Sequence, residues 1–191
     1  MKKYGIWIVL GLLVLFSISS YNGLVTSRET VNKTWSNVEN QYQRRSDLIP
    51  NLVSTVKGAA DFEKSTLTAV MEARANATSI RIDPNNMTPE KLQQYQAAQS
   101  QVGGALSRLL AVAENYPQLK AVESFNQLQA QLEGTENRIN EARRQFNDAS
   151  QGYNTSRSKF PRVLFAGLFG FKERPYFEAD KGTEKAPSVK F

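Results

Sequence analysis

Apolar residues in this chain form one almost uninterrupted block, followed by stretches in which they recur at spacings of three and four. The block is Ile6–Ile18, and no charged residue occurs in 4–27. A helix that crosses a bilayer needs about 20 predominantly apolar residues, a length the block reaches if residues 19–23 lie at the interface. The pattern therefore predicts an N-terminal transmembrane anchor over residues 1–23, with a cleaved signal peptide as the alternative.

The periodic stretches predict four amphipathic helices, because apolar side chains spaced by three and four residues share one face of a helix. The first of these faces follows the anchor without a linker and comprises Val31, Trp35, Val38, Tyr42, Arg45 and Ile49. The other three begin near Val53, Leu92 and Leu119. Since no strand-like alternation competes, we expect an all-α fold: an up-and-down antiparallel four-helix bundle whose first helix is continuous with the transmembrane helix.

Proline and capping residues suggest where these helices begin and end. Basic and capping residues at 44–47 precede Pro50, which predicts that the first helix ends there and the second begins. The alternative is one long helix kinked at Pro50, which is costly for a proline inside a helix. Residues 83–86 predict a turn, Thr88 starts the third helix, and Pro117 starts the fourth and longest.

A short apolar and aromatic segment, residues 160–171, follows the fourth helix. An up-and-down topology returns this segment to the membrane side of the bundle, where it is too short to span and too apolar to remain in water. We weigh three partners for it: the lipid interface, the protein's own bundle and another subunit. The candidate membrane-contact residues are Lys2, Lys3, Tyr4, Trp7, Phe160, Leu164, Phe165, Leu168, Phe169, Phe171 and Lys172. The expected organisation is an anchor (1–23), a bundle (24–159), this membrane-proximal or packing segment (160–178) and a flexible tail (179–191).

Composition narrows the possible functions. The chain has 191 residues, no Cys and no His, so disulfides, thiol or imidazole catalysis and zinc sites of the Cys/His kind are excluded. The net charge of +6 comes from the two ends, because residues 27–156 carry 14 basic and 14 acidic side chains. A nucleic-acid-binding protein would place a basic excess on its folded core. We therefore expect no nucleic-acid partner, and a bilayer near the basic tail.

Polar residues around Pro50 are the best candidates for a binding site. Arginines beside a helix N-terminus can hold an anion or an acidic peptide, and the candidates are Arg44, Arg45, Asp47, Pro50 and Asn51. The same residue types also build a capped corner between two helices, which is the alternative interpretation. Carboxylate pairs elsewhere in the chain lack the spacing or the partners of a catalytic site. We expect no enzymatic activity, no cofactor and no metal.

Several motifs together resemble those of the LemA family. They are Tyr21-Asn22-Gly23-Leu24-Val25, the two stretches Val31–Val38 and Gln41–Val53, Glu72-Ala73-Arg74-Ala75, Asn115-Tyr116-Pro117-Gln118-Leu119-Lys120, and the ending from Tyr153 to Phe171. The resemblance runs from the anchor to about Phe177. It implies a single-pass membrane protein with a four-helix bundle, and it carries over no catalytic residues.

Two functions follow as expectations. The first is a membrane-anchored scaffold that self-assembles as a homo-oligomer at the bacterial cell envelope and shapes or organises membrane. The second is an adaptor that presents the bundle to another envelope membrane protein, such as a protease or a transporter. Lys2, Lys3 and the free amine slightly outweigh Arg28 and Lys33 under the positive-inside rule. We therefore expect a cytoplasmic N-terminus and an extracytoplasmic, periplasmic bundle in the inner membrane, whereas a prediction often attached to the family places the short N-terminus outside.

Overall fold

The computed structural model describes residues 2–58 and 63–178, with side chains from Tyr4 onward. Within these ranges every regular element is a helix, so the predicted all-α class is confirmed. The helices are α1 (Lys2–Lys57), α2 (Lys64–Ser79), the 3₁₀ helix η1 (Pro84–Asn86), α3 (Pro89–Ala113), α4 (Pro117–Lys120), α5 (Glu123–Ser158) and α6 (Arg162–Leu168). The predicted flexible tail, 179–191, lies outside the described residues.

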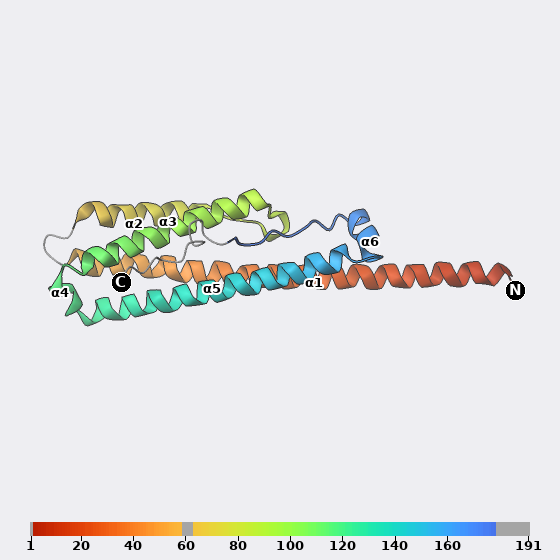
Figure 1. The fold of residues 1–191 in the computed structure, drawn as a ribbon, viewed down its shortest axis with the longest axis horizontal. Coiled ribbons are helices and arrows are strands. Elements are labelled where there is room, and N and C mark those ends of the chain that lie inside the picture. The colour runs from red at the N-terminus through yellow and green to blue at the C-terminus, as the bar shows by residue number, and fades with distance from the viewer. Residues whose placement is uncertain (1, 59–62, 179–191) are drawn as a thin grey trace, which may run out of the picture.

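The four long helices alternate in direction along the bundle, which agrees with the expected up-and-down order (Figure 1). α5 packs against α1 along the part of α1 that lies within the bundle, and α2 packs against α3. The N-terminal part of α1 extends well beyond the other helices, at the right of the view (Figure 1). α6 lies beside α1 at the point where this extension leaves the bundle.

Two clusters of buried side chains form the core. The cluster nearer the extension includes Leu24, Trp35, Tyr95, Phe146, Tyr153 and Phe177. The cluster nearer the far end includes Ile49, Leu52, Val70, Leu109, Leu119 and Leu132. The ring of Trp35 lies at the centre of the first cluster, 5.3 Å from Tyr95, 5.6 Å from Phe146 and 6.1 Å from Phe177 between centroids. Buried aromatic pairs at such distances contribute beyond the area they bury.

The predicted break between two helices at Pro50 is wrong, because α1 continues through it to Lys57. Proline lacks an N–H, so the carbonyl of Ser46 loses the donor that the helix would normally supply. Arg74 of α2 replaces that donor: its Nε donates to the Ser46 carbonyl at 2.8 Å. Ile49 and Leu52, on either side of the proline, are both fully buried. Tertiary contacts thus compensate for the proline, and the second helix of the bundle begins only at α2.

We expect Arg74→Ala to lower the free energy of unfolding by about 1–2 kcal/mol, because a partly buried carbonyl would lose its donor. In a Pro50→Ala background the main-chain N–H returns to Ser46, so the same Arg74 substitution should cost less than half as much. Denaturant unfolding of the four proteins of this cycle measures the coupling. Equal costs in both backgrounds would show that Arg74 does not act through the carbonyl freed by Pro50.

The start of α3 is confirmed, whereas the start of the last long helix is not. Thr88 Oγ1 accepts a hydrogen bond from the Lys91 N–H at 3.3 Å, with Pro89 at the first helical position. Pro117 begins only the single turn α4, and α5 starts at Glu123 after an extended residue at Val122. Leu119 is buried at this corner, so the chain turns there to place it in the core. The longest helix is therefore α1, with 56 residues.

Candidate functional site

The N-terminal extension of α1 is long and apolar enough to cross a membrane, as the sequence predicts. Its large apolar side chains are exposed in the isolated chain rather than packed in a core. They are Ile6, Trp7, Ile8, Val9, Leu10, Leu12, Leu13, Val14, Leu15, Phe16 and Ile18. The predicted interfacial ring Tyr4 is also exposed, and the side chains of Lys2 and Lys3 lie outside the described ones. Such a surface is what a membrane-spanning helix presents to lipid.

One face of α6 packs on the protein's own helices. Phe165 contacts Phe16 with ring centroids 5.8 Å apart, and Phe169 and Phe171 lie 5.2 and 5.6 Å from the ring of Tyr21. Ala166 on this face is buried between α1 and α5. Packing on the chain's own bundle therefore accounts for part of the apolar segment.

The other face of α6 remains uncovered. The exposed fraction is 81% for Phe160, 63% for Leu164 and 77% for Leu168. Leu164 and Leu168 are four residues apart in α6 and therefore share one side of that helix, whereas Phe160 lies in the turn just before it. Lys172, just beyond this face, is exposed as well. Of the aromatic candidates that follow the fourth long helix, Phe160 is thus the most exposed, whereas the predicted membrane contact of Phe171 is wrong for this conformation, because its ring is buried at 6% exposure.

Beyond α6, residues 171–178 form an extended strap along α5. Asn154 pairs with the main chain of Arg174 on both sides, its Oδ1 accepting from the N–H at 2.9 Å and its Nδ2 donating to the carbonyl at 2.8 Å. Asn147 pairs with the main chain of Phe177 in the same way, at 2.8 and 3.0 Å. The two asparagines are seven residues apart, so they share one face of α5. Side-chain amides thereby supply the partners that a neighbouring strand would supply in a sheet.

The strap brings two aromatic residues, Phe171 and Phe177, and one basic residue, Arg174, into the bundle. Phe177 is 6% exposed among Trp35 and Phe146. Arg174 is 5% exposed, and its guanidinium donates to the Pro84 carbonyl and to Asn32 Oδ1. The strap therefore links α1, α5 and the loop before α3.

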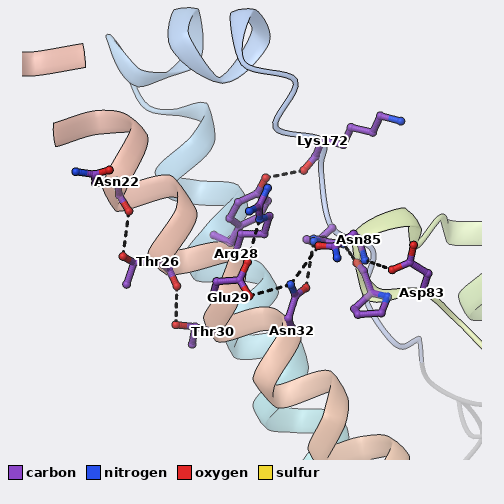
Figure 2. A network of polar contacts seen from close by, with 12 residues as sticks. Asn22, Thr26, Arg28, Glu29, Thr30, Asn32, Asp83, Asn85 and Lys172 are labelled. Carbon is purple, nitrogen blue, oxygen red and sulfur yellow. Dashed lines mark hydrogen bonds and ion pairs between the residues drawn. The ribbon is translucent and has the colours of Figure 1, made fainter. Parts of the chain in front are cut away.

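Polar residues of α1 meet that loop just beyond the extension. Figure 2 shows Asn32 between Glu29 of its own helix and Asn85 of η1, with Nδ2 3.3 Å from an oxygen of each. Asp83 Oδ1 accepts the main-chain N–H of Asn85 at 2.9 Å and fixes the loop. These contacts hold the η1 loop against α1.

The predicted binding candidates around Pro50 do not converge on one site. Arg45 points into the bundle and is buried, whereas Arg44, Asp47 and Asn51 are exposed on α1. Because α1 is continuous here, the alternative of a capped helix-helix corner is wrong as well. Asp47 accepts a hydrogen bond from Gln43 along the same helix at 2.7 Å.

Arg45 links three helices of the bundle. Its Nη2 donates to the carbonyl and to Oε1 of Gln99 at 2.9 and 2.7 Å, and its Nη1 pairs with Glu136 Oε2 at 3.0 Å. The guanidinium also lies over the ring of Tyr42, 5.0 Å from its centroid. With its donors so engaged, Arg45 has a structural role in this conformation.

A cavity of about 310 Å³ lies between α1, α2 and α3 beside Arg45. Its polar lining includes Glu39, Ser46, Arg74 and Arg81, and Ser46 Oγ has no hydrogen-bond partner among the described residues. Burial raises the pKa of Glu39, opposed by the indole N–H of Trp35 and the charge of Arg81. The cavity combines charges of both signs in a partly buried setting.

Glu39 makes stability depend on pH in a defined direction. Because its pKa is higher in the folded than in the unfolded chain, the folded state binds more protons, and stability falls as pH rises from 4.5 through the folded value. We expect Glu39→Gln to raise the melting temperature at pH 7 and to have little effect below pH 4.5. Melting curves across this pH range measure the change in melting temperature. A lower melting temperature of the variant at pH 7 would show that the charged Glu39 carboxylate stabilises the fold.

Some structurally important residues carried no signal in the pattern of the sequence. Arg74, Asn147 and Asn154 are polar residues of helices, where polar residues usually face solvent, and Arg174 lies in the extended strap. The spacing of seven between the two asparagines indicates only that they share one face of a helix. The same spacing is common between residues that bind nothing. Among the described residues, no group of three or more acidic side chains could hold a metal ion.

Comparison with known proteins adds a family and named relatives. The model of the LemA family matches residues 34–191. Magnetosome protein MamQ 2 of Paramagnetospirillum magneticum is 29% identical over 175 residues, which cover 83% of this chain and 64% of that protein. Magnetosome protein MamQ of Magnetospirillum gryphiswaldense is 28% identical over 174 residues, with 82% and 64% covered. The chain thus spans just under two thirds of the length of these relatives.

Proposed function

This chain belongs to the LemA family, and from that premise we propose that it is a membrane-anchored, non-enzymatic structural protein that self-assembles into a scaffold at the cell envelope. The resemblance seen in its sequence motifs is thereby confirmed. The magnetosome relatives are named for a cellular structure and not for a reaction, which supports a structural role more than a catalytic one.

The continuity of α1 is the observation that carries this proposal. One helix of 56 residues contains both the apolar extension and a full side of the bundle core, with Leu24 and Val31 buried directly after it. A rigid connection transmits the orientation of the bundle to the membrane, which a scaffold requires. A tethered binding domain would have no need of it and more often carries a flexible linker.

The orientation follows the charges at the two ends of the anchor. Lys2 and Lys3 directly precede the span, whereas Arg28 and Lys33, the first basic residues after it, lie farther from its end. This balance supports a cytoplasmic N-terminus and an extracytoplasmic bundle in the inner membrane. Because the chain has no cysteine, Thr68→Cys provides a single labelling site on the exposed surface of α2. Labelling by an impermeant maleimide from the outer side supports this orientation; labelling only from the cytosol overturns it.

Particle mass tests the scaffold directly. The full-length chain is extracted in mild detergent, and its mass is measured by light scattering together with class-averaged electron images of the same peak. A defined particle of many subunits is expected. A monomer or dimer would overturn self-assembly and favour an adaptor for another envelope membrane protein, to be sought by copurification.

A further inference from the structure

The uncovered face of α6 forms a surface that continues the apolar surface of the anchor. Leu164 and Leu168 of α6, together with the exposed ring of Phe160 just before the helix, make up this surface, which we call the α6 outer face. The inner side of α6 reaches the anchor through the contact of Phe165 with Phe16. The two apolar surfaces are therefore neighbours rather than separate patches.

The position of α6 along α1 places it at one boundary of the membrane. A helix rises about 1.5 Å per residue and a hydrocarbon core is about 30 Å thick, so a span that begins near Tyr4 ends near residue 23. The rings of α6 and the strap contact Phe16 and Tyr21, within the last turns of that span. α6 thus lies level with the inner edge of one headgroup layer, on the same side as the bundle.

Basic side chains lie at the same level. Arg162 Nη2 lies 3.6 Å from where a Cβ on Gly23 would be, and its Nη1 donates to Ser156 Oγ at 2.7 Å. Lys159 and Lys172 flank α6 and are exposed. The stretch 159–172 contains no acidic residue. Its charge therefore complements an anionic surface.

We propose that α6 is an interfacial helix, with its outer face in the acyl-chain boundary and with Lys159, Arg162 and Lys172 bound to the headgroups of anionic phospholipids. This inference rests on the proposed membrane anchor. Apolar side chains directed at acyl chains and basic side chains at headgroup level are the usual properties of such helices. α6 would then be a second attachment point that fixes the tilt of the bundle against the bilayer.

A second copy of the chain is the competing occupant of this face. Two copies related by a two-fold axis through the α6 outer face would bring their Lys159, Arg162 and Lys172 together, and like charges oppose such a contact. A bilayer supplies both the apolar layer and the opposite charge at the required level. Charge complementarity and continuity with the anchor therefore favour lipid.

Single nitroxide labels measure the depth of α6. The full-length chain has no cysteine, so Leu168→Cys, Leu13→Cys and Thr68→Cys each carry one label, on the α6 outer face, in the anchor and on the exposed surface of α2. The proteins are reconstituted in vesicles of phosphatidylcholine with 30% phosphatidylglycerol. Collision rates with oxygen, which concentrates in lipid, and with a water-soluble nickel chelate then report the depth of each label.

We expect the label at Leu168 to collide preferentially with oxygen, as at Leu13 but at shallower depth, and the label at Thr68 to collide with nickel. A label at Leu168 that collides with nickel like the one at Thr68 would overturn the proposal. So would a label shielded from both reagents and broadened by a second nitroxide, because that result would place another copy on the α6 outer face.

Charge variants test the lipid class. One variant carries glutamine in place of Lys159, Arg162 and Lys172. In the anionic vesicles, we expect its label at Leu168 to be several-fold more accessible to the nickel chelate. The matched control replaces Lys64, Arg108 and Lys120, which are exposed at helical positions away from α6, and should leave it unchanged. Equal depth in pure phosphatidylcholine and in anionic vesicles would overturn the role of anionic headgroups.

The label at Leu13 separates this inference from the proposed function. If Leu13 is in lipid while Leu168 is in water, the anchor holds and the interfacial helix fails. If neither label is in lipid, the proposed membrane anchor itself fails. Self-assembly is judged independently by particle mass, so a monomer with α6 at the interface would leave this inference intact.

Discussion

Phe177→Ala is expected to lower the free energy of unfolding by about 3–5 kcal/mol, the usual cost of removing a buried phenylalanine side chain. The ring of Phe177 is stacked on Trp35, in contact with Phe146 and beneath the guanidinium of Arg143 at 4.9 Å. Its removal leaves a cavity in the first core cluster and weakens the attachment of the strap. The strap would then be held by its polar contacts, which include the two asparagine pairs and the hydrogen bonds of the Arg174 guanidinium.

Fluorescence of Trp35 reports this loss directly. The chain has two tryptophans, so a Trp7→Phe background leaves Trp35 as the single emitter in the detergent-solubilised full-length protein. Phe160→Ala is the matched control, because the same side chain is removed from an 81% exposed position, and it should change stability by less than about 0.5 kcal/mol. A loss below about 1 kcal/mol for Phe177→Ala would show that the strap does not complete the core.

Arg45→Ala is the second large effect, and we expect it to cost about 2–3 kcal/mol. The substitution leaves Gln99 Oε1 without its donor in a buried setting and removes the charge that pairs with Glu136. The full penalty of breaking a buried ion pair, about 3–5 kcal/mol, does not apply, because the Glu136 side chain is 49% exposed and water can solvate its carboxylate.

Two further substitutions define how Arg45 acts. Glu136→Ala should cost less than Arg45→Ala, since the guanidinium keeps both acceptors of Gln99. Arg44→Ala is the neighbouring control on the same helix, exposed to solvent, and should be nearly neutral. Denaturant midpoints of the three proteins are compared; similar losses for Arg44 and Arg45 would mean that the effect is one of general helix charge.

The sequence alone determined the helical class, the apolar extension and the beginning of α3. These features depend on neighbours within a few residues: the three-and-four spacing of apolar side chains, the uncharged run before Arg28, and Thr88 with Pro89 at a helix start. Interactions between residues so close in the sequence can be predicted from the order of the residues alone. The binding candidates around Pro50 were chosen by the same local logic, which could not show where each side chain points.

Tertiary structure decided the course of α1 at Pro50, the burial of Arg45 and the position of the strap. Each depends on a partner distant in sequence: Ser46 on Arg74, Arg45 on Gln99, and Asn32 on Arg174, with separations of 28, 54 and 142 residues. A proline interrupts a helix when no other group donates a hydrogen bond to the carbonyl four residues before it. An arginine side chain faces solvent when the core offers no acceptor for its guanidinium. Whether such a partner exists depends on how the helices pack, so only the folded chain settles it.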